Sequence, residues 1–434
     1  MNRQTPIAVI DAVRTPMAKA FTTFSDQSAV QLGTHAVGAL LKRAMRKADG
    51  FDYRQVDEVI MGNVAGPPDA ANIARVIALS AGIPKDRIAH TVNRNCASGM
   101  ESIIGAWQTI ESQRSEFVVA GGTESMSQIP MLVSPKAAKL WMRLAKCRTW
   151  KQRIATIAKF RPSHFKPIIG VQLGLTDPVS RMNMGETAEL LARQFEITRQ
   201  QQDQFALRSH QKAAAARKEC FFSGEIASLM IGEKTISKDN GPRDEQSLEQ
   251  LAKLRPFFDR SGTVTAGNSC PLTDGAAAML LTSIETSLRF DRPLGYISAY
   301  AVAGCDPHRM GLGPVYATAK LLDQTGLRLD DFDLVELNEA FAAQVIACQR
   351  AFASKRFASE ELGRSMAIGE LDDDRLNVHG GAIALGHPVG MTGTRLVLTL
   401  LRSLRKRGLR KGLATLCVGG GQGVAMMVET ELEG

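Results

Sequence analysis

Apolar residues in the first 125 positions follow two alternating patterns, short continuous runs and runs at helical spacing. The strand-like runs cover 7–10, 56–64, 88–92 and 117–125, and the helix-like stretches cover 31–44, 72–80 and 100–112. Alternation of buried strands with amphipathic helices is typical of a sheet that has helices on both faces. The sequence therefore predicts an α/β fold for this part of the chain.

A second series of the same patterns begins near Leu294. It contains strands at 296–302, 333–338 and 414–421, a helix at 315–324, and a turn at 377–393 that precedes another helix. The strand at 333–338 takes the place of 57–63, and the turn at 377–393 takes the place of the turn around Cys96. We therefore expect two topologically similar halves whose strand-to-helix turns can face one another across one site.

The residues from about 125 to 256 break this alternation and are expected to form an inserted loop domain. Polar-faced helices are predicted at 184–195 and 198–219. The segment 136–166 contains ten Lys or Arg and no Asp or Glu, and without these ten the chain has 43 basic and 44 acidic residues. The net charge of +9 therefore belongs to this segment, which can be a solvated helix face or can bind a polyanionic ligand, a membrane surface or a partner protein.

Length and composition limit the class of protein. The 434 residues, 44% of them hydrophobic, are enough for two or three packed units. No apolar run approaches the roughly 20 residues that span a bilayer. The first six residues lead directly into a strand and leave no room for a signal or transit peptide, so we expect a cytoplasmic protein.

The cysteines are dispersed, at positions 96, 147, 220, 270, 305, 348 and 417. None lies in a CxxC pair or at the spacing of zinc ligands, so we expect reduced thiols and no bound metal. Because the positive charge is confined to one segment, no nucleic-acid partner is expected.

The strongest candidate for chemistry is Cys96, in the stretch Asn93-Arg94-Asn95-Cys96-Ala97-Ser98-Gly99. It lies where a strand turns into a helix, so unpaired N–H groups and the helix dipole are predicted to favour its thiolate, the nucleophilic form. The small residues that follow leave room for a substrate. The alternative is a buried cysteine that only packs.

Three C-terminal stretches combine polar side chains with exposed backbone N–H groups. They are Asn338-Glu339-Ala340-Phe341, the glycine-rich 380–390 with His387 before a helix, and 417–423, where Cys417 precedes a run of glycines. Taken singly, His387 and Cys417 could be packing residues and Asn338 could cap the following helix. Glu339 can act by orienting its neighbours.

Together these motifs resemble the thiolase family, and the similarity extends over nearly the whole chain. Further shared motifs are 14–16, 121–126, 254–259, 262–268 and 274–277. The resemblance implies a thiolase fold, in which two similar βαβαβαββ halves form a five-layer α-β-α-β-α arrangement. The halves would be 1–124 with 257–290 and 291–434, and the inserted loop domain 125–256 would bind CoA or a partner.

The resemblance also implies the roles of the site residues. Cys96 would attack the ketone of a 3-ketoacyl-CoA and keep the acyl group as a thioester. His387 would accept the proton of this thiol, and Cys417 would protonate the departing enolate. One oxyanion would be held by His387 and a water on Asn338, the other by the N–H groups of Cys96 and Gly419.

Substrate contacts are expected from Cys270, Phe341 and Arg243. Relatives usually carry serine and then glycine where this chain has Cys270 and Pro271, so the hydrogen bond to the pantetheine arm would be weaker and the wall stiffer. CoA would be a co-substrate, and no permanently bound cofactor or metal is expected.

The resemblance predicts a 3-ketoacyl-CoA thiolase of fatty-acid β-oxidation that forms a homodimer or higher oligomer. The alternatives are an acetoacetyl-CoA thiolase, a decarboxylating ketoacyl synthase, which Cys417 argues against, and a non-catalytic acyl-CoA carrier or scaffold. The basic segment 136–166 resembles that of thiolase subunits in fatty-acid oxidation complexes, so it would dock a hydratase/dehydrogenase subunit or a membrane surface. Those subunits often have histidine in place of Asn338, and this chain does not.

Overall fold

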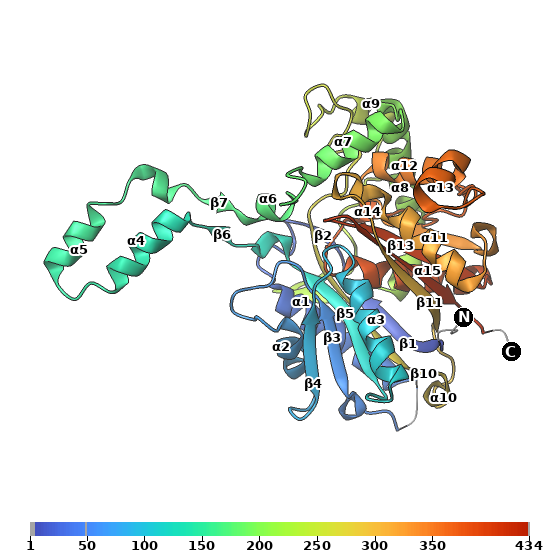
Figure 1. Ribbon diagram of the computed structural model, residues 1–434. Coiled ribbons are helices and arrows are strands. Elements are labelled where there is room, and N and C mark those ends of the chain that lie inside the picture. Colours follow the sequence, from blue (N-terminus) through green and yellow to red (C-terminus); the bar gives the residue numbers. More distant parts are fainter. Residues whose placement is uncertain (1–4, 48–49, 433–434) are drawn as a thin grey trace. The chain divides into compact units, whose positions relative to one another are not determined.

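The computed structural model describes residues 5–47 and 50–432 (Figure 1). The chain divides into two compact units, one formed by residues up to 128 together with 177–434, and the other by 129–176. The expected loop domain 125–256 is thus divided between the two units. The reason is that α7 (Met184–Gln194) and α8 (Arg199–Lys218) both pack against α12 (Ala342–Ala353).

The N-terminal half is built on five strands in the order β4-β3-β5-β10-β1. They are β1 (Ile7–Arg14), β3 (Glu58–Gly62), β4 (Ile88–Val92), β5 (Val118–Glu124) and β10 (Thr273–Ser283). β3 is parallel to β4 and β5, whereas β10 is antiparallel to β1 and β5. The apolar pattern did not predict β10, because its Gly and Ala residues have low strand propensity.

The C-terminal half repeats this order as β12-β13-β14-β11, which confirms the predicted internal repeat. Its strands are β11 (Gly295–Gly304), β12 (Leu334–Leu337), β13 (Lys411–Val418) and β14 (Gln422–Glu429). The counterpart of β4 is reduced to one bridge between Val335 and Leu376. The two half-sheets join where the start of β1 pairs with the start of β11, and the short β2 (Ala18–Lys19) extends β10.

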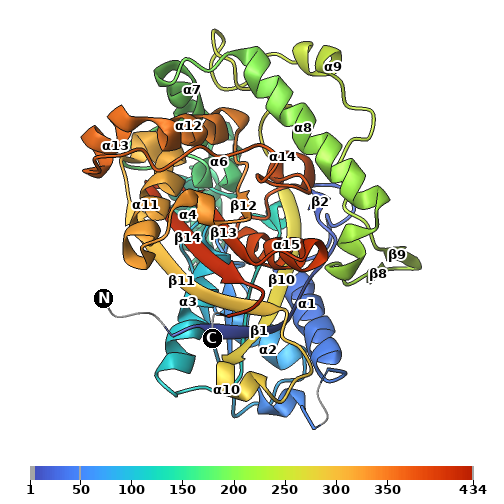
Figure 2. The same cartoon turned by 90° about the vertical axis from the view of Figure 1, so that its right-hand side faces the viewer.

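Helices form the remaining layers (Figures 1 and 2). In the centre, α3 (Ser98–Glu111) and α15 (Thr392–Arg407) contact one another and the half-sheets around them. The other face of the N-terminal half is covered by α1 (Ala29–Ala44) and α2 (Ile73–Ser80), and that of the C-terminal half by α11 (Gly313–Thr325) and α12. The predicted five-layer arrangement is therefore confirmed.

The starts of α3 and α15 touch through glycines. A Cβ on Gly99 would lie 2.8 Å from the backbone nitrogen of Thr394, and a Cβ on Gly393 would lie 2.4 Å from that of Met100. Real Cβ atoms do not approach backbone this closely, so only glycine permits the crossing. The turns that precede these two helices, which carry Cys96 and His387, are thereby brought together.

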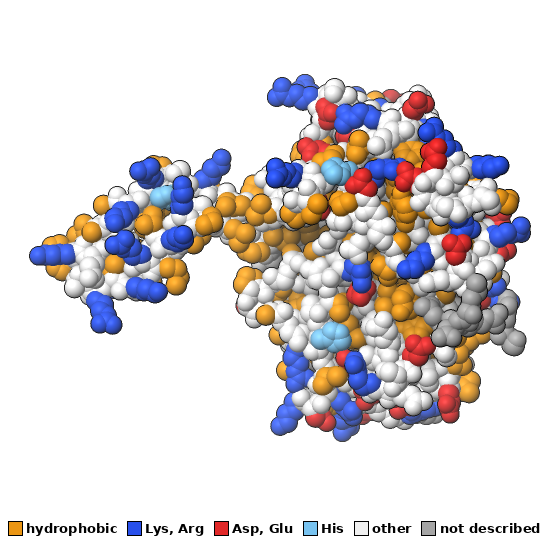
Figure 3. All heavy atoms as spheres, in the orientation of Figure 1, with side chains coloured by type: hydrophobic (Ala, Val, Ile, Leu, Met, Phe, Trp, Pro, Cys, Tyr) orange, Lys and Arg blue, Asp and Glu red, His pale blue; other side chains and the backbone are white. Residues whose placement is uncertain are grey.

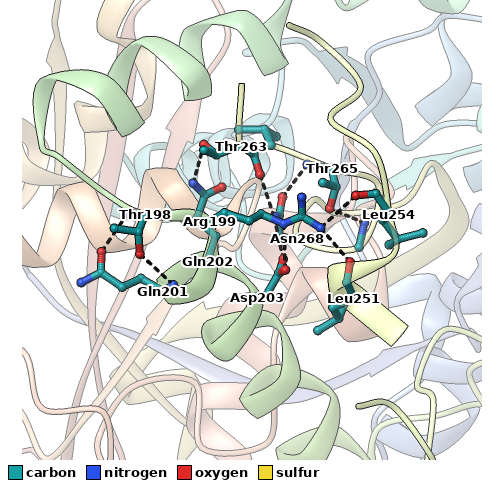
Figure 4. Close-up of polar contacts among 12 residues, drawn as sticks. Thr198, Arg199, Gln201, Gln202, Asp203, Leu251, Leu254, Thr263, Thr265 and Asn268 are labelled. Carbon is teal, nitrogen blue, oxygen red and sulfur yellow. Dashed lines mark hydrogen bonds and ion pairs between the residues drawn. The ribbon is translucent and has the colours of Figure 1, made fainter. Parts of the chain in front are cut away.

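α8, the long green helix in Figure 2, supports the segment that leads to Cys270. Figure 4 shows the network: Asp203 pairs with Arg199 at 2.7 Å and accepts a hydrogen bond from Asn268 Nδ2 at 3.0 Å. Arg199 also donates to the carbonyl oxygens of Leu251 and Leu254. The ion pair of Arg199 and Asp203 at the start of α8 therefore fixes the backbone path of residues 263–268.

The second unit, 129–176, is a helical hairpin closed by a pair of short strands, β6 (Met131–Leu132) and β7 (Ile168–Ile169). The predicted amphipathic stretch forms two helices, α4 (Pro135–Ala145) and α5 (Trp150–Ile157), and is followed by α6 (Gly170–Gly174). The rings of Trp141 and Phe160 pack at 4.9 Å between centroids.

The remaining short elements belong to the larger unit. They are α9 (Leu248–Ala252), α10 (Ile284–Ser287), α13 (Lys355–Leu362), α14 (Ala382–Leu385), β8 (Leu229–Ile231) and β9 (Lys234–Ile236). Within the described residues, no helix combines the length and apolar character needed to cross a membrane.

Trp107 provides a test of the central layer. Its side chain is fully buried in α3 and packs against Tyr300 at 5.3 Å, and its Nε1–H has no partner in the described part of the chain. Trp107→Ala should lower the free energy of unfolding by about 3–5 kcal/mol because it leaves a cavity. Trp107→Phe should cost less, because it keeps a ring and removes an unpaired donor. Urea denaturation of both variants measures the difference, and equal losses would contradict this account of the core.

Candidate active site

Cys96 lies between β4 and α3 and is half-buried. Asn95, just before it, has a φ of 45°, and the Ser98 hydroxyl donates to the Asn95 carbonyl at 2.7 Å, so the turn is closed locally. Burial raises the pKa of the Cys96 thiol above its ordinary value, and hydrogen bonds from the backbone N–H groups of Gly419 and Cys96 only partly oppose this. The predicted thiolate of the free protein is therefore wrong, and this nucleophile needs a base.

His387 follows α14 on the turn before α15 and is 7% exposed. Its backbone N–H donates to Thr273 Oγ1 at 3.2 Å, and its Nδ1 lies 2.7 Å from Thr392 Oγ1. The Thr392 hydroxyl donates its own proton to the Pro388 carbonyl at 2.9 Å. Because that hydroxyl has only one proton, the network assigns the imidazole proton to Nδ1.

The other nitrogen of this imidazole, Nε2, is buried and has no partner within the described residues. Burial, with a smaller effect from the nearby Arg395 guanidinium, lowers the pKa of His387 to about 4. The ring is therefore neutral near pH 7 and carries a free lone pair on Nε2. This is the state that a general base requires.

Cys417 is buried at the end of β13. Burial raises the pKa of its thiol well above the ordinary value, and negative charge on Cys96, Cys348 or Cys270 would raise it further. Cys417 is therefore a thiol at neutral pH. Its electrostatic interactions with Cys96, Cys348 and Cys270 indicate that the Cys417 sulfur lies near these thiols, which are far apart in sequence.

The loop after β13 is tied to the Cys96 turn. Asn95 Nδ2 donates to the Gly419 carbonyl at 2.8 Å, and Arg94 Nη1 donates to Gln422 Oε1 at 2.8 Å. These bonds join the two halves of the repeat. They hold the Gly419 N–H beside the Cys96 sulfur, where it forms part of a candidate oxyanion hole.

Asn338 directly follows β12 and is fully buried. Its backbone N–H donates to the Thr415 carbonyl at 3.0 Å, but neither its Oδ1 nor its Nδ2 has a partner within the described part of the chain. A buried amide left unpaired costs about 1–3 kcal/mol, so a polar ligand or water is expected there. The capping interpretation of Asn338 is wrong, because the N-cap of α12 is Phe341.

The expected substrate contacts lie at different depths. The Cys270 N–H donates to the Ala340 carbonyl at 3.0 Å, two residues from Asn338, and burial raises the pKa of its thiol to about 12. The buried Phe341 ring packs against Phe258 at 5.9 Å. Arg243 is exposed and its backbone N–H donates to His210 Nδ1, so its side chain lies at the surface, and its contact with CoA stays a prediction.

Several contacts around the site were not expected from the sequence. Thr392, which orients the His387 ring, is an ordinary helix-start residue whose only signal is its five-residue spacing from the histidine. Glu124 accepts hydrogen bonds from one N–H group of the histidine turn, that of Gly390, and from three N–H groups of residues 63–65. It lies in a motif shared with the resembled family, but the sequence carries no sign of its partners.

Comparison with known proteins agrees with this arrangement. Residues 7–285 match the profile described as thiolase, N-terminal domain, and residues 291–430 match thiolase, C-terminal domain. A protein of Photobacterium profundum named 3-ketoacyl-CoA thiolase is 40% identical over 98% of this chain and 97% of its own.

Solved structures are similar as well. The Bacillus anthracis acetyl-CoA acetyltransferase has a TM-score of 0.85 and 37% identity over 99% of this chain and 100% of its own. The human mitochondrial 3-ketoacyl-CoA thiolase in complex with CoA has a TM-score of 0.84 and 36% identity, over 99% and 98%. With both family profiles matched in order and relatives similar over their full length, this chain belongs to the thiolase family.

Proposed function

We propose that this protein is a 3-ketoacyl-CoA thiolase, which cleaves a 3-ketoacyl-CoA with CoA to acetyl-CoA and a shortened acyl-CoA. The observation that carries the proposal is the neutral His387 beside the crossing of α3 and α15, with its Nε2 lone pair free, at the site where Cys96 and Cys417 meet. The names of the curated relatives support the substrate class.

In the first half-reaction, His387 Nε2 accepts the proton of Cys96 as the sulfur attacks the C3 ketone. The C2–C3 bond then breaks, which leaves the shortened acyl group as a thioester on Cys96 and releases the enolate of acetyl-CoA. Cys417, kept protonated by its raised pKa, donates its proton to C2 of this enolate. The proton on His387 returns to the Cys417 sulfur when acetyl-CoA leaves.

In the second half-reaction, His387 accepts the proton of the incoming CoA thiol, and the CoA sulfur attacks the acyl-cysteine. The new thioester bond forms as the bond to Cys96 breaks, and Cys96 takes up the proton. One oxyanion is stabilised by a water that the unpaired amide of Asn338 holds. The other is stabilised by the backbone N–H groups of Cys96 and Gly419. This chemistry needs CoA as co-substrate and no permanently bound cofactor.

The acyl-enzyme gives the direct test. With a 3-ketoacyl-CoA and no added CoA, mass spectrometry should find one acyl group on a peptide containing Cys96. Cys96→Ser should abolish this adduct and lower thiolysis on the order of 1,000-fold or more, whereas the matched control Cys147→Ser, a thiol in the hairpin unit, should behave as wild type. Normal thiolysis by Cys96→Ser would contradict the mechanism, and a folded wild-type protein without adduct or turnover would favour a non-catalytic carrier.

The second candidate is an acetoacetyl-CoA thiolase, which the structural similarity to an acetyl-CoA acetyltransferase favours. Both activities need the same catalytic groups and differ in the room for the acyl chain. We expect kcat/KM to be higher for C12 to C16 3-ketoacyl-CoA than for acetoacetyl-CoA, because longer chains bury more apolar surface. Measuring kcat/KM for both substrate classes with one enzyme preparation distinguishes the two functions, and a higher value for acetoacetyl-CoA would establish the alternative.

The basic hairpin unit, 129–176, suits an anionic membrane surface better than a protein partner. Its ten Lys and Arg form no ion pair among the described residues, and Trp141, Trp150 and Ile154 are exposed between them. Figure 3 shows this mixture of cationic and apolar side chains, with no acidic ones on the visible face of the unit. Amphipathic helices with cations and tryptophan are typical of interfacial binding.

Removing positive charges from the hairpin unit tests the proposed binding to a membrane surface. Lys139→Gln, Arg143→Gln and Lys151→Gln together should weaken binding to phosphatidylserine vesicles on the order of 100-fold, at roughly 1 kcal/mol per cation. Trp150→Ser should weaken it too, while Arg356→Gln, which removes a cation from α13, should not. If vesicles do not bind but the triple variant loses co-purification with a hydratase/dehydrogenase subunit, the hairpin docks that subunit instead.

We also propose a cytoplasmic homodimer. The seven cysteines are all free, which fits a reducing compartment. Strand β4 forms one edge of the sheet, and the side chain of Ile88 at its start is exposed, which suits pairing with a second copy. Light scattering should give twice the 47.0 kDa chain mass, for the wild type and the hairpin variants alike.

A further inference from the structure

Two buried carboxylates accept hydrogen bonds from the turn that carries His387, one near its start and one near its end. We propose that Glu124 and Glu339 are positioning residues, which fix the His387 imidazole against Cys96 by accepting backbone N–H groups of residues 381–391. This inference rests on the proposed role of His387 as the base. Neither carboxylate contacts the reacting atoms in the proposed mechanism, so both would act through the turn.

Glu124 holds the end of the turn. Its Oε2 accepts from the Gly390 N–H at 3.0 Å and the Val64 N–H at 3.0 Å, and its Oε1 accepts from the Ala65 N–H at 3.1 Å and Asn63 Nδ2 at 3.0 Å. All four donors are N–H groups, so the site is built for an acceptor-only side chain. A glutamine there would turn an N–H toward two other N–H groups.

Glu339 holds the start of the turn. Its Oε2 accepts from the Ile383 N–H at 3.2 Å and the Ser209 hydroxyl at 2.6 Å, and its Oε1 accepts from Asn377 Nδ2 at 2.9 Å. The Asn377 amide in turn exchanges two hydrogen bonds with the backbone of Leu337, at the end of β12. Glu339 therefore links the histidine turn to the strand end that carries Asn338.

The turn is glycine-rich because the carboxylates lie directly against its backbone. A Cβ on Gly381 would lie 2.2 Å from the Glu339 carboxyl carbon, and a Cβ on Gly390 would lie 2.9 Å from Glu124 Oε2. The two anchors belong to different halves, since Glu124 ends β5 and Glu339 follows β12. The imidazole is thereby placed relative to both halves, and hence to a nucleophile that belongs to the first.

The experiment replaces each carboxylate by its amide, with Glu360→Gln on the exposed face of α13 as the matched control. Glu124→Gln and Glu339→Gln should lower kcat by about 10–100-fold, as misplacement by 1 Å can do, with KM for CoA within about threefold of wild type. Alkylation of Cys96 by iodoacetamide should slow in parallel, because the misplaced base removes the thiol proton less well. Glu360→Gln should match wild type in all three measurements.

A double-mutant comparison separates positioning from general damage. In a His387→Ala background, either carboxylate substitution should leave the alkylation rate of Cys96 unchanged within about twofold, because the base through which it acts is already absent. If the carboxylate substitution slows alkylation of Cys96 in the His387→Ala background by the same factor as in the wild type, the inference is overturned. Wild-type thiolysis by His387→Ala would instead overturn the role of the base itself, so the two failures are distinguishable.

If the carboxamide variants do not fold, milder variants test the positioning role of Glu124 and Glu339. Asn63→Ala and Ser209→Ala each remove one donor to a carboxylate and leave the carboxylate in place. Each should lower kcat in the same direction by a smaller factor, with KM unchanged. Wild-type kcat in both, or in folded Glu124→Gln and Glu339→Gln, would overturn the inference.

Discussion

The site depends on one close approach, the crossing of α3 and α15 at their first turns. Gly99 and Gly393 bring the two backbones together at distances that any side chain would prevent. The crossing is possible because the two helices are counterparts in the internal repeat, each following a turn with an asparagine at a φ of 45°, Asn95 and Asn377. The repeated turn thus carries Cys96 in one half and His387 in the other.

Burial sets the proton chemistry at this crossing. It raises the pKa values of Cys96 and Cys417 and lowers that of His387, because each charged form loses its hydration. The resting site is therefore neutral, with two thiols and one imidazole. Because alkylation and oxidation require a thiolate, the raised pKa of Cys96 should slow both reactions until a base removes the thiol proton.

The apolar patterns were sufficient to predict the repeat, whereas the residues at the crossing were predicted together only through the motifs shared with the thiolase family. Apolar periodicity located α1, α3, α8 and α11, but it missed β10, whose small residues carry little strand signal. The thiolate prediction failed because a local helix dipole is a weaker influence than burial, and burial is a property of the whole fold. Thr392 and Glu124 were missed for a related reason, since their partners are set by tertiary contacts.

The buried polar groups around the site are satisfied to different degrees. Glu124 and Glu339 accept hydrogen bonds from N–H and O–H donors of several segments, which tie the turns around the crossing together. Asn338 is next to Glu339, but its side chain has no partner among the described residues. A buried amide without a partner costs stability, and such a cost is typical of functional sites. The proposed water at Asn338 would supply the missing partner, which fits a site whose polar groups are completed only when it is occupied.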